Sequence, residues 1–283
     1  MKKQLFTIGL IIITLIASTS MLSAKPNKII KGNGNVIKKE FNVNTFKGIS
    51  IGSVFKIHLK QGPIQSVVIE TDDNIMDILD VSVSDNKLNI QQKESVGIEK
   101  PTEMNVYITA KELNVIGISG ATKLFLETDF ITESTFIFDI SGAVFVPTAK
   151  STIKADMIII DISGAAKLDN LNINCNTLTV DASGASKIKL SGVANKKIIE
   201  VSGAANVSAE NTISKDADIE ASGAGTVIIK DGESIKMDKS GAGTIIIKED
   251  GESIKIDKSG TIIIKEGGES IKIDKSGAIK IVD

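Results

Sequence analysis

Hydrophobic and polar residues alternate with period two along most of the chain beyond residue 40. The alternation is clearest in residues 136–140, 158–162 and 178–182, where Phe, Ile, Leu, Val or Ala occupies every second position. This pattern, rich in β-branched and aromatic residues, is typical of strands with one buried face. No stretch of about ten residues or more with helical periodicity separates these runs, which argues against alternating strands and helices. We therefore expect an all-β protein.

A tripeptide repeat divides this pattern into units. Ser-Gly-Ala, or Ser-Gly-Thr in one copy, occurs nine times at intervals of 17 to 22 residues. Each unit reads as a strand, a tight turn at Ser-Gly, a second strand and a second turn, and turn residues such as those at 231–234 and 250–253 mark the second turn. This regular period predicts a parallel β-solenoid with about 17–22 residues per coil.

Glycine suits the corner because it adopts positive φ, and equivalent residues of successive coils should stack about 4.8 Å apart. We interpret the repeated dipeptide as a structural corner column. Its members are Ser119, Gly120, Ser141, Gly142, Ser163, Gly164, Ser183, Gly184, Ser202, Gly203, Ser222, Gly223, Ser240, Gly241, Ser259, Gly260, Ser276 and Gly277.

An acid stands two residues before the corner serine in eight of the nine units, and by parity it points outward. This acidic ladder consists of Asp139, Asp161, Asp181, Glu200, Glu220, Asp238, Asp257 and Asp274. Stacked carboxylates resemble the pair of a retaining glycosidase in their spacing, but eight equivalent exposed acids lack the unlike environments that catalysis needs. We therefore favour a solvated ladder, accompanied by an outward lysine column at Lys236, Lys255 and Lys272.

Three lysines of the last units leave two possibilities open. Lys239, Lys258 and Lys275 occupy a position that earlier units fill with a hydrophobic residue. Either the strand ends one residue sooner there, or these side chains leave the core at the corner.

The N-terminal region differs from the repeats. Residues 1–24 have two lysines, a 13-residue apolar run and small residues before Lys25, which is the layout of a signal peptide. Beyond it we expect a lead at 25–39, a less regular β segment at 40–115 and the regular solenoid at 116–283. Within the irregular segment, Asp72-Asp73-Asn74 suits an N-capped turn of helix. We expect an exported protein of the periplasm, outer surface or medium, without a transmembrane segment in the mature chain.

Composition narrows the chemistry. The chain is 42% hydrophobic and 24% charged, with 33 basic residues, all lysine, against 35 acidic ones. The balanced charge and the absence of arginine argue against nucleic-acid binding. The single cysteine, Cys175, excludes a disulfide framework, and we interpret it as an idle thiol and His58 as a surface residue. We expect no catalytic residue, no cofactor and no metal, calcium included, and the threonines at 226, 244 and 261 read as strand residues.

The first two thirds of the chain resemble a known family. Residues 46–51, 54–63, 67–75 and 88–90, followed by Ile118-Ser-Gly-Ala, are similar to the auto-transporter adhesin head GIN domain family of bacterial proteins. The resemblance covers roughly residues 40–230, and the last units look like added copies of its coil. It implies a right-handed parallel β-helix with small turns between two sheets, no known catalytic residues and a role in adhesion.

These observations favour a non-enzymatic, adhesin-like binding or structural protein whose partner is a cell-surface, matrix or envelope component. The alternative is a polysaccharide lyase or hydrolase with a β-helix fold, based on the acidic ladder. A third hypothesis is homo-oligomerisation through the exposed strand edge of the C-terminal coil.

Overall fold

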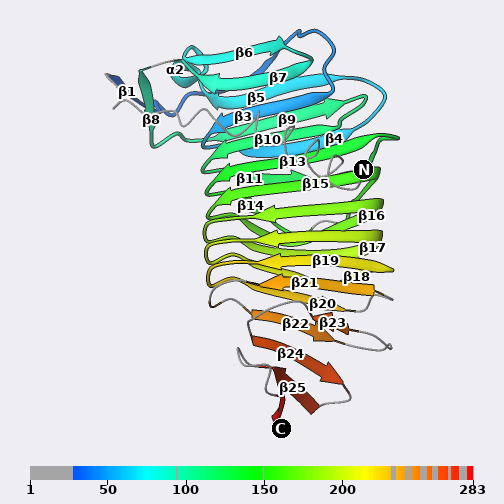
Figure 1. Ribbon diagram of the computed structural model, residues 1–283. Helices are drawn as coiled ribbons and strands as arrows, with labels where there is room; N and C mark the ends of the chain where they lie inside the picture. Colours follow the sequence, from blue (N-terminus) through cyan, green and yellow to red (C-terminus); the bar gives the residue numbers. More distant parts are fainter. Residues whose placement is uncertain are drawn as a thin grey trace.

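The computed structural model is a stack of β-strand coils with a broader head at its N-terminal end (Figure 1). It describes residues 28–230 apart from positions 94 and 149, and beyond them residue 242 and the strands β21 to β26. Beyond residue 230, side chains are described only at 242 and 244–247. The β-solenoid that the repeat predicts is present, with about six turns. The predicted signal peptide lies outside the described residues.

The strands that run into the Ser-Gly corners form one side of the solenoid, here called the upstream face. Apart from the antiparallel β6–β7 hairpin at the head, neighbouring strands on this face are parallel. In spatial order they are β6 (Leu79–Ser84), β7 (Lys87–Gln92), β3 (Gly48–Ser53), β10 (Val115–Gly120), β13 (Thr135–Gly142), β15 (Thr152–Gly164), β16 (Lys167–Ala182), β17 (Lys187–Val201), β19 (Asp216–Ala221), β21 (Ser234–Lys239) and β23 (Ile254–Ile256).

The strands that leave the corners form the downstream face. They are β2 (Val36–Glu40), β5 (Ser66–Asp72), β9 (Met104–Ala110), β4 (Lys56–Gln61), β11 (Lys123–Leu126), β14 (Phe145–Val146), the first residues of β16 and β17, β18 (Asn206–Ile213), β20 (Thr226–Lys230), β22 (Thr244–Lys248), β24 (Thr261–Glu266), β25 (Glu269–Ile273) and β26 (Ile279–Val282). A short third face joins β12 (Phe130–Ile131) to parts of β15 to β18. The head also carries α2 (Asp73–Met76) and a two-stranded arm of β1 (Lys28–Lys31) and β8 (Val96–Glu99).

Backbone contacts between glycines connect the corners of successive coils. Each of these glycines has positive φ, and a Cβ on Gly142 would lie 2.6 Å from the carbonyl oxygen of Gly120. The same contact recurs coil after coil, so the glycines at 120, 142, 164, 184, 203 and 223 lie in single file. The corner residues Ser240, Gly241, Ser259, Gly260, Ser276 and Gly277 lie outside the described residues. Ser53 occupies the head of the file with φ 118°, although it is not glycine.

The core follows the alternation of the sequence, but it also holds a lysine. Phe136, Phe138 and Ile140 point inward and are fully buried, and equivalent positions of later coils hold Ile, Leu, Val or Ala. Lys197 also points inward and is fully buried, in register between Leu178 and Ala217. Its Nζ donates hydrogen bonds to the carbonyl oxygens of Thr212 (2.8 Å) and Lys230 (3.3 Å). These bonds offset the free-energy cost of burying the charged ammonium group in the core.

The last repeats depart from the predicted stack. β24 pairs antiparallel with β25, and β25 pairs antiparallel with β26, so the final units form a meander and not a further parallel coil. Only residues 267–268 connect β24 to β25, and so short a connection can join antiparallel strands only. Lys272 therefore pairs with Ile263, whereas Lys255 stacks in parallel on Lys236 as predicted. Lys239 lies in register with Ala221, and Lys258 and Lys275 lie outside the described residues.

Asp72 anchors the N-terminal lead and does not cap the helical turn. The turn exists at α2, but the side chain of Asp72 makes no capping hydrogen bond, so the capping prediction was wrong. The buried carboxylate instead accepts hydrogen bonds from the backbone N–H groups of Gly34 (2.6 Å) and Thr102 (2.7 Å) and from the Thr102 hydroxyl (2.8 Å). Burial alone would raise the pKa of Asp72, but these donors outweigh it and hold the pKa below its ordinary value. The carboxylate of Asp72 thus ties the lead, at Gly34, to the segment that follows β8, at Thr102.

We expect Gly142→Ala to lower the free energy of unfolding by about 2–4 kcal/mol. The new Cβ would clash with the backbone of Gly120, and alanine disfavours the positive φ of this position. Ser53→Gly should instead raise it by about 1 kcal/mol, because the same conformation is already strained there. Urea unfolding measures both changes, and the exposed Ser141→Ala serves as the neighbouring control. Equal stabilities of Gly142→Ala and the wild type would contradict the backbone contact.

Candidate functional site

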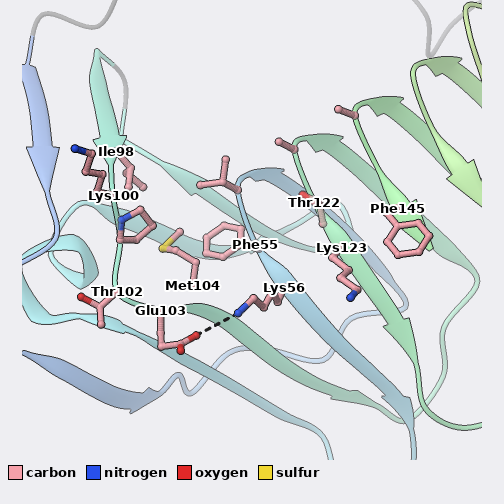
Figure 2. Close-up of a pocket in the computed structure, with 14 residues that line it drawn as sticks. Phe55, Lys56, Ile98, Lys100, Thr102, Glu103, Met104, Thr122, Lys123 and Phe145 are labelled. Atoms are coloured by element: carbon pink, nitrogen blue, oxygen red, sulfur yellow. Dashed lines mark hydrogen bonds and ion pairs between the residues drawn. The ribbon is translucent and has the colours of Figure 1, made fainter. Parts of the chain in front are cut away.

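A groove of about 650 Å³ opens at the head, between the first corners and the segment that follows β8 (Figure 2). One wall holds Val54, Ala121 and Ala143, which directly follow the first corner turns. The opposite wall is the segment from Ile98 to Met104. The groove lies between this segment and the corner column.

Apolar side chains and lysines line the groove together. Phe55 and Met104 are almost fully buried, while Phe145 is half-buried at the end farthest from the arm. Three lysines and one acid supply the charge of the lining, at Lys56, Lys100, Lys123 and Glu103. Lys100 has φ 47°, a left-handed backbone that non-glycine residues rarely adopt and that often occurs at binding sites.

The positive charge of the groove is only partly neutralised. Lys56 pairs with Glu103 at 3.4 Å, as Figure 2 shows. Among the described residues, no ion pair within 4 Å includes Lys100 or Lys123. The ammonium of Lys123 lies over the ring of Phe125 (4.8 Å to the centroid) and also near Phe145 (5.5 Å). This stacking orients the cation without removing its charge.

A stack of rings continues from the groove across the downstream face. His58 lies between Tyr107 and Phe125, with ring centroids 4.9 and 4.8 Å away. His58 faces outward, as expected. Its Nδ1 lies 2.6 Å from Oε1 of Glu127, a carboxylate partner that the sequence did not reveal. Burial would raise the pKa of Glu127, but hydrogen bonds and charges from His58 and Lys60 outweigh it and lower the pKa.

The predicted acidic ladder is a single row on the outer surface of the upstream face. Its described members, each in register with the next, are Asp139, Asp161, Asp181, Glu200, Glu220 and Asp238, while Asp257 and Asp274 lie outside the described residues. The side chains of the first four are half-buried, so the expectation of fully exposed acids was wrong for them. They lie in a dense row on the sheet, beside other half-buried side chains, which limits their contact with water.

Burial raises the pKa of each of these four acids. For Asp161, burial and the charges of Asp181 and Asp139 together raise the pKa to about 6. A retaining glycosidase needs neighbouring carboxyl groups with opposite shifts, one to donate a proton and one to attack. Neighbours in this row shift in the same direction for the same reason, so the ladder gives the glycosidase alternative no support.

The remaining sequence candidates are placed apart from the groove. Cys175 is buried on the short face, and burial together with the charge of Asp156 raises its pKa to about 11, so its thiol is poorly suited to act as a nucleophile. Thr226, Thr244 and Thr261 lie in one column on the downstream face. Among the described residues, no group of three or more His, Cys, Asp or Glu side chains is arranged to hold a metal ion.

Comparison with known proteins identifies the family. Residues 45–251 match the family described as "Putative auto-transporter adhesin, head GIN domain". The chain belongs to this family. None of the curated proteins compared with this GIN-domain protein matches it in sequence. In the part of the chain that the structure describes, no helix is both long and apolar enough to cross a membrane.

Solved structures share the GIN-domain fold. A "putative lipid binding protein" from Parabacteroides distasonis ATCC 8503 has a TM-score of 0.76 and 20% identity, covering 84% of this chain and 100% of that chain. A "putative adhesin" from Parabacteroides merdae ATCC 43184 has a TM-score of 0.67 and 18% identity, covering 84% and 99%. A "putative adhesin" from Bacteroides fragilis NCTC 9343 has a TM-score of 0.63 and 23% identity, covering 83% and 99%. The solenoid with its less regular head is therefore a recurring architecture.

The acidic ladder makes the stability of this GIN-domain protein depend on pH. The folded pKa of Asp161 is about 6 against an ordinary 3.8, so the folded state binds the proton more tightly and stability should fall as pH rises from about 4 to about 6. Asp161→Asn should flatten part of this slope and, allowing for solvent screening, raise the unfolding free energy at pH 8 by about 1 kcal/mol. Urea unfolding of a dilute sample against pH measures it, with the exposed Glu133→Gln as control. A pH profile unchanged by Asp161→Asn would mean that this carboxylate is fully hydrated.

Proposed function

We propose that this chain is an exported, non-enzymatic binding protein of the cell envelope, and that its head groove binds an amphiphile with an acyl chain and an anionic headgroup. The observation that carries the proposal is the pairing of an apolar floor with two lysines that have no acidic partner within 4 Å among the described residues. Membership of an adhesin-like family supports a role in binding, and the lipid-binding description of one structural neighbour supports the ligand class.

The dimensions and chemistry of the groove suit one acyl chain. A volume of about 650 Å³ lies within the usual range of small-molecule sites, about 300–1,000 Å³. The chain would lie over Phe55 and Met104 and against the half-buried ring of Phe145, from which it displaces water. The positive charges of Lys100 and Lys123, which line opposite walls, would attract the headgroup, and each lysine near an anionic lipid contributes about 1 kcal/mol.

Binding of single-chain phospholipids tests this proposal. We expect the purified protein to bind lysophosphatidylglycerol at least about tenfold more tightly than lysophosphatidylcholine, because only the first carries net negative charge. The double variant Lys100→Glu/Lys123→Glu should lose at least about tenfold in affinity for the anionic lipid. Isothermal titration calorimetry below the critical micelle concentration measures these constants.

Lys187→Glu is the matched control, because Lys187 lies on the same face beyond the groove and should leave the affinity unchanged. Glycerol phosphate tests the need for the acyl chain and should bind far more weakly than the lipid. Equal binding by the wild type and the double variant would refute the site, and tight binding of glycerol phosphate would refute the amphiphile.

Export rests on the sequence of residues 1–24 and is tested separately. We expect the protein recovered from the envelope or periplasmic fraction to begin near Lys25, because the small residues before it suit cleavage by a signal peptidase. N-terminal sequencing of the fractionated protein measures this. Full-length protein confined to the cytoplasmic fraction would contradict export.

A further inference from the structure

The outer surface of the upstream face carries unpaired acids beside a row of aliphatic side chains. Asp139, Asp161, Asp181 and Glu200 form the acidic row, and no ion pair within 4 Å among the described residues includes any of them. Two positions earlier in three of the four strands, Ile137, Ile159 and Ile198 are half-buried on the same outer surface, and Thr179 takes this place before Asp181. The upstream face therefore presents a row of acids without ion-pair partners beside partly accessible aliphatic side chains.

The outer surface of the downstream face has the opposite charge. Lys123, Phe145, Lys167 and Lys187 follow one another in register, one residue per coil. The ammonium groups of Lys123 and Lys167 lie 5.5 and 5.0 Å from the ring centroid of Phe145, one on each neighbouring coil. Lys167 also pairs with Asp169 at 2.7 Å, whereas no ion pair among the described residues includes Lys187. This row therefore combines aromatic surface with excess positive charge.

We infer that the acidic row of one molecule docks against the lysine row of a second copy of this chain, so that solenoids associate side by side. Both rows repeat once per coil, about 4.8 Å apart, and one correctly placed pair therefore brings the neighbouring pairs into register. Within one molecule the rows lie on different faces, which meet at the corner column (Figure 1). No ion pair of the described residues joins the two rows. A second copy presents the complementary row with the same spacing.

The composition of the two rows agrees with such a contact. Isoleucines beside the acids supply apolar area that Phe145 can cover, while carboxylates meet lysines. The complementary charges fix the register and orientation of the two copies, because two acidic rows or two lysine rows would repel one another. Because the two contacting surfaces differ, each docked copy leaves one surface of each kind free, and association continues as an open array and does not stop at a dimer.

The lysine row shares Lys123 and Phe145 with the groove, so the contact and the groove ligand meet at one end of this row. The centre of the contact lies farther along, at the pairing of Asp161 and Asp181 with Lys167 and Lys187, none of which lines the groove. Loss of lipid binding and loss of association are therefore separable results.

Charge reversal on one row at a time tests the inference. At low salt, about 50 mM, sedimentation velocity should show that the wild type associates increasingly with concentration. Asp161→Lys/Asp181→Lys should remain monomeric, because both of its rows are positive, and Lys167→Glu/Lys187→Glu should remain monomeric with two negative rows. An equimolar mixture of the two variants should associate again, because each supplies the row that the other lacks.

Two controls keep each outcome decisive. Glu133→Lys and Lys215→Glu reverse exposed charges outside both rows and should associate like the wild type. Asp161→Asn/Asp181→Asn preserves side-chain shape where lysine could disturb the coil, and it should weaken association at least about tenfold. A wild type that stays monomeric at high concentration would overturn the inference, and so would a mixture of folded variants that stays monomeric.

Discussion

The close approach of backbone to backbone at the Ser-Gly corner is the constraint on which this structure depends. At the described corners from Gly142 to Gly223, the space that a side chain would fill is occupied by the carbonyl group of the preceding glycine, as between Gly120 and Gly142. Such a contact holds neighbouring coils at one spacing and in one register, because a shift by one residue would bring a Cβ into the file. The rows of acids, isoleucines and lysines on the two faces are consequences of that register.

The head shows what happens where the constraint is relaxed. Its first corner has the reversed dipeptide Gly52-Ser53, so a serine takes the conformation that glycine holds in every later described corner. The segment after β8 leaves the stack there, Asp72 ties the lead to it, and the space between this segment and the corners becomes the groove. The regular coils thus provide a rigid scaffold, and the irregular end provides the concave surface that a small ligand requires.

Much of the fold was predictable because its determinants are local and periodic. Alternation identified the buried positions, and the repeated dipeptide identified the corners, both of which are properties of single strands and turns. The inward turn of Lys197 was not predictable, because it depends on carbonyl groups of two later strands, at Thr212 and Lys230. The antiparallel end was missed because the repeat motif persists there, although the two-residue connection at 267–268 contained the relevant signal.

The candidate site was largely hidden in the sequence. The contact between His58 and Glu127 joins residues 69 positions apart, and the groove depends on how one irregular segment stands against three separate corners. Neither has a local motif. The lysines of the groove look like ordinary outward residues in the sequence, and only their place beside the apolar lining of the groove distinguishes Lys100 and Lys123.

Distances between spin labels along the corner column test the in-register stack most directly. With Cys175 replaced by serine, labels at Ser119 and Ser202 span four coils, and labels at Ser119 and Ser222 span five. Pulsed electron paramagnetic resonance should give Cα separations of about 19 Å and about 24 Å, allowing for the label arms, with a constant increment of about 4.8 Å per coil. Separations that do not increase with the number of intervening repeats would contradict a single file of corners.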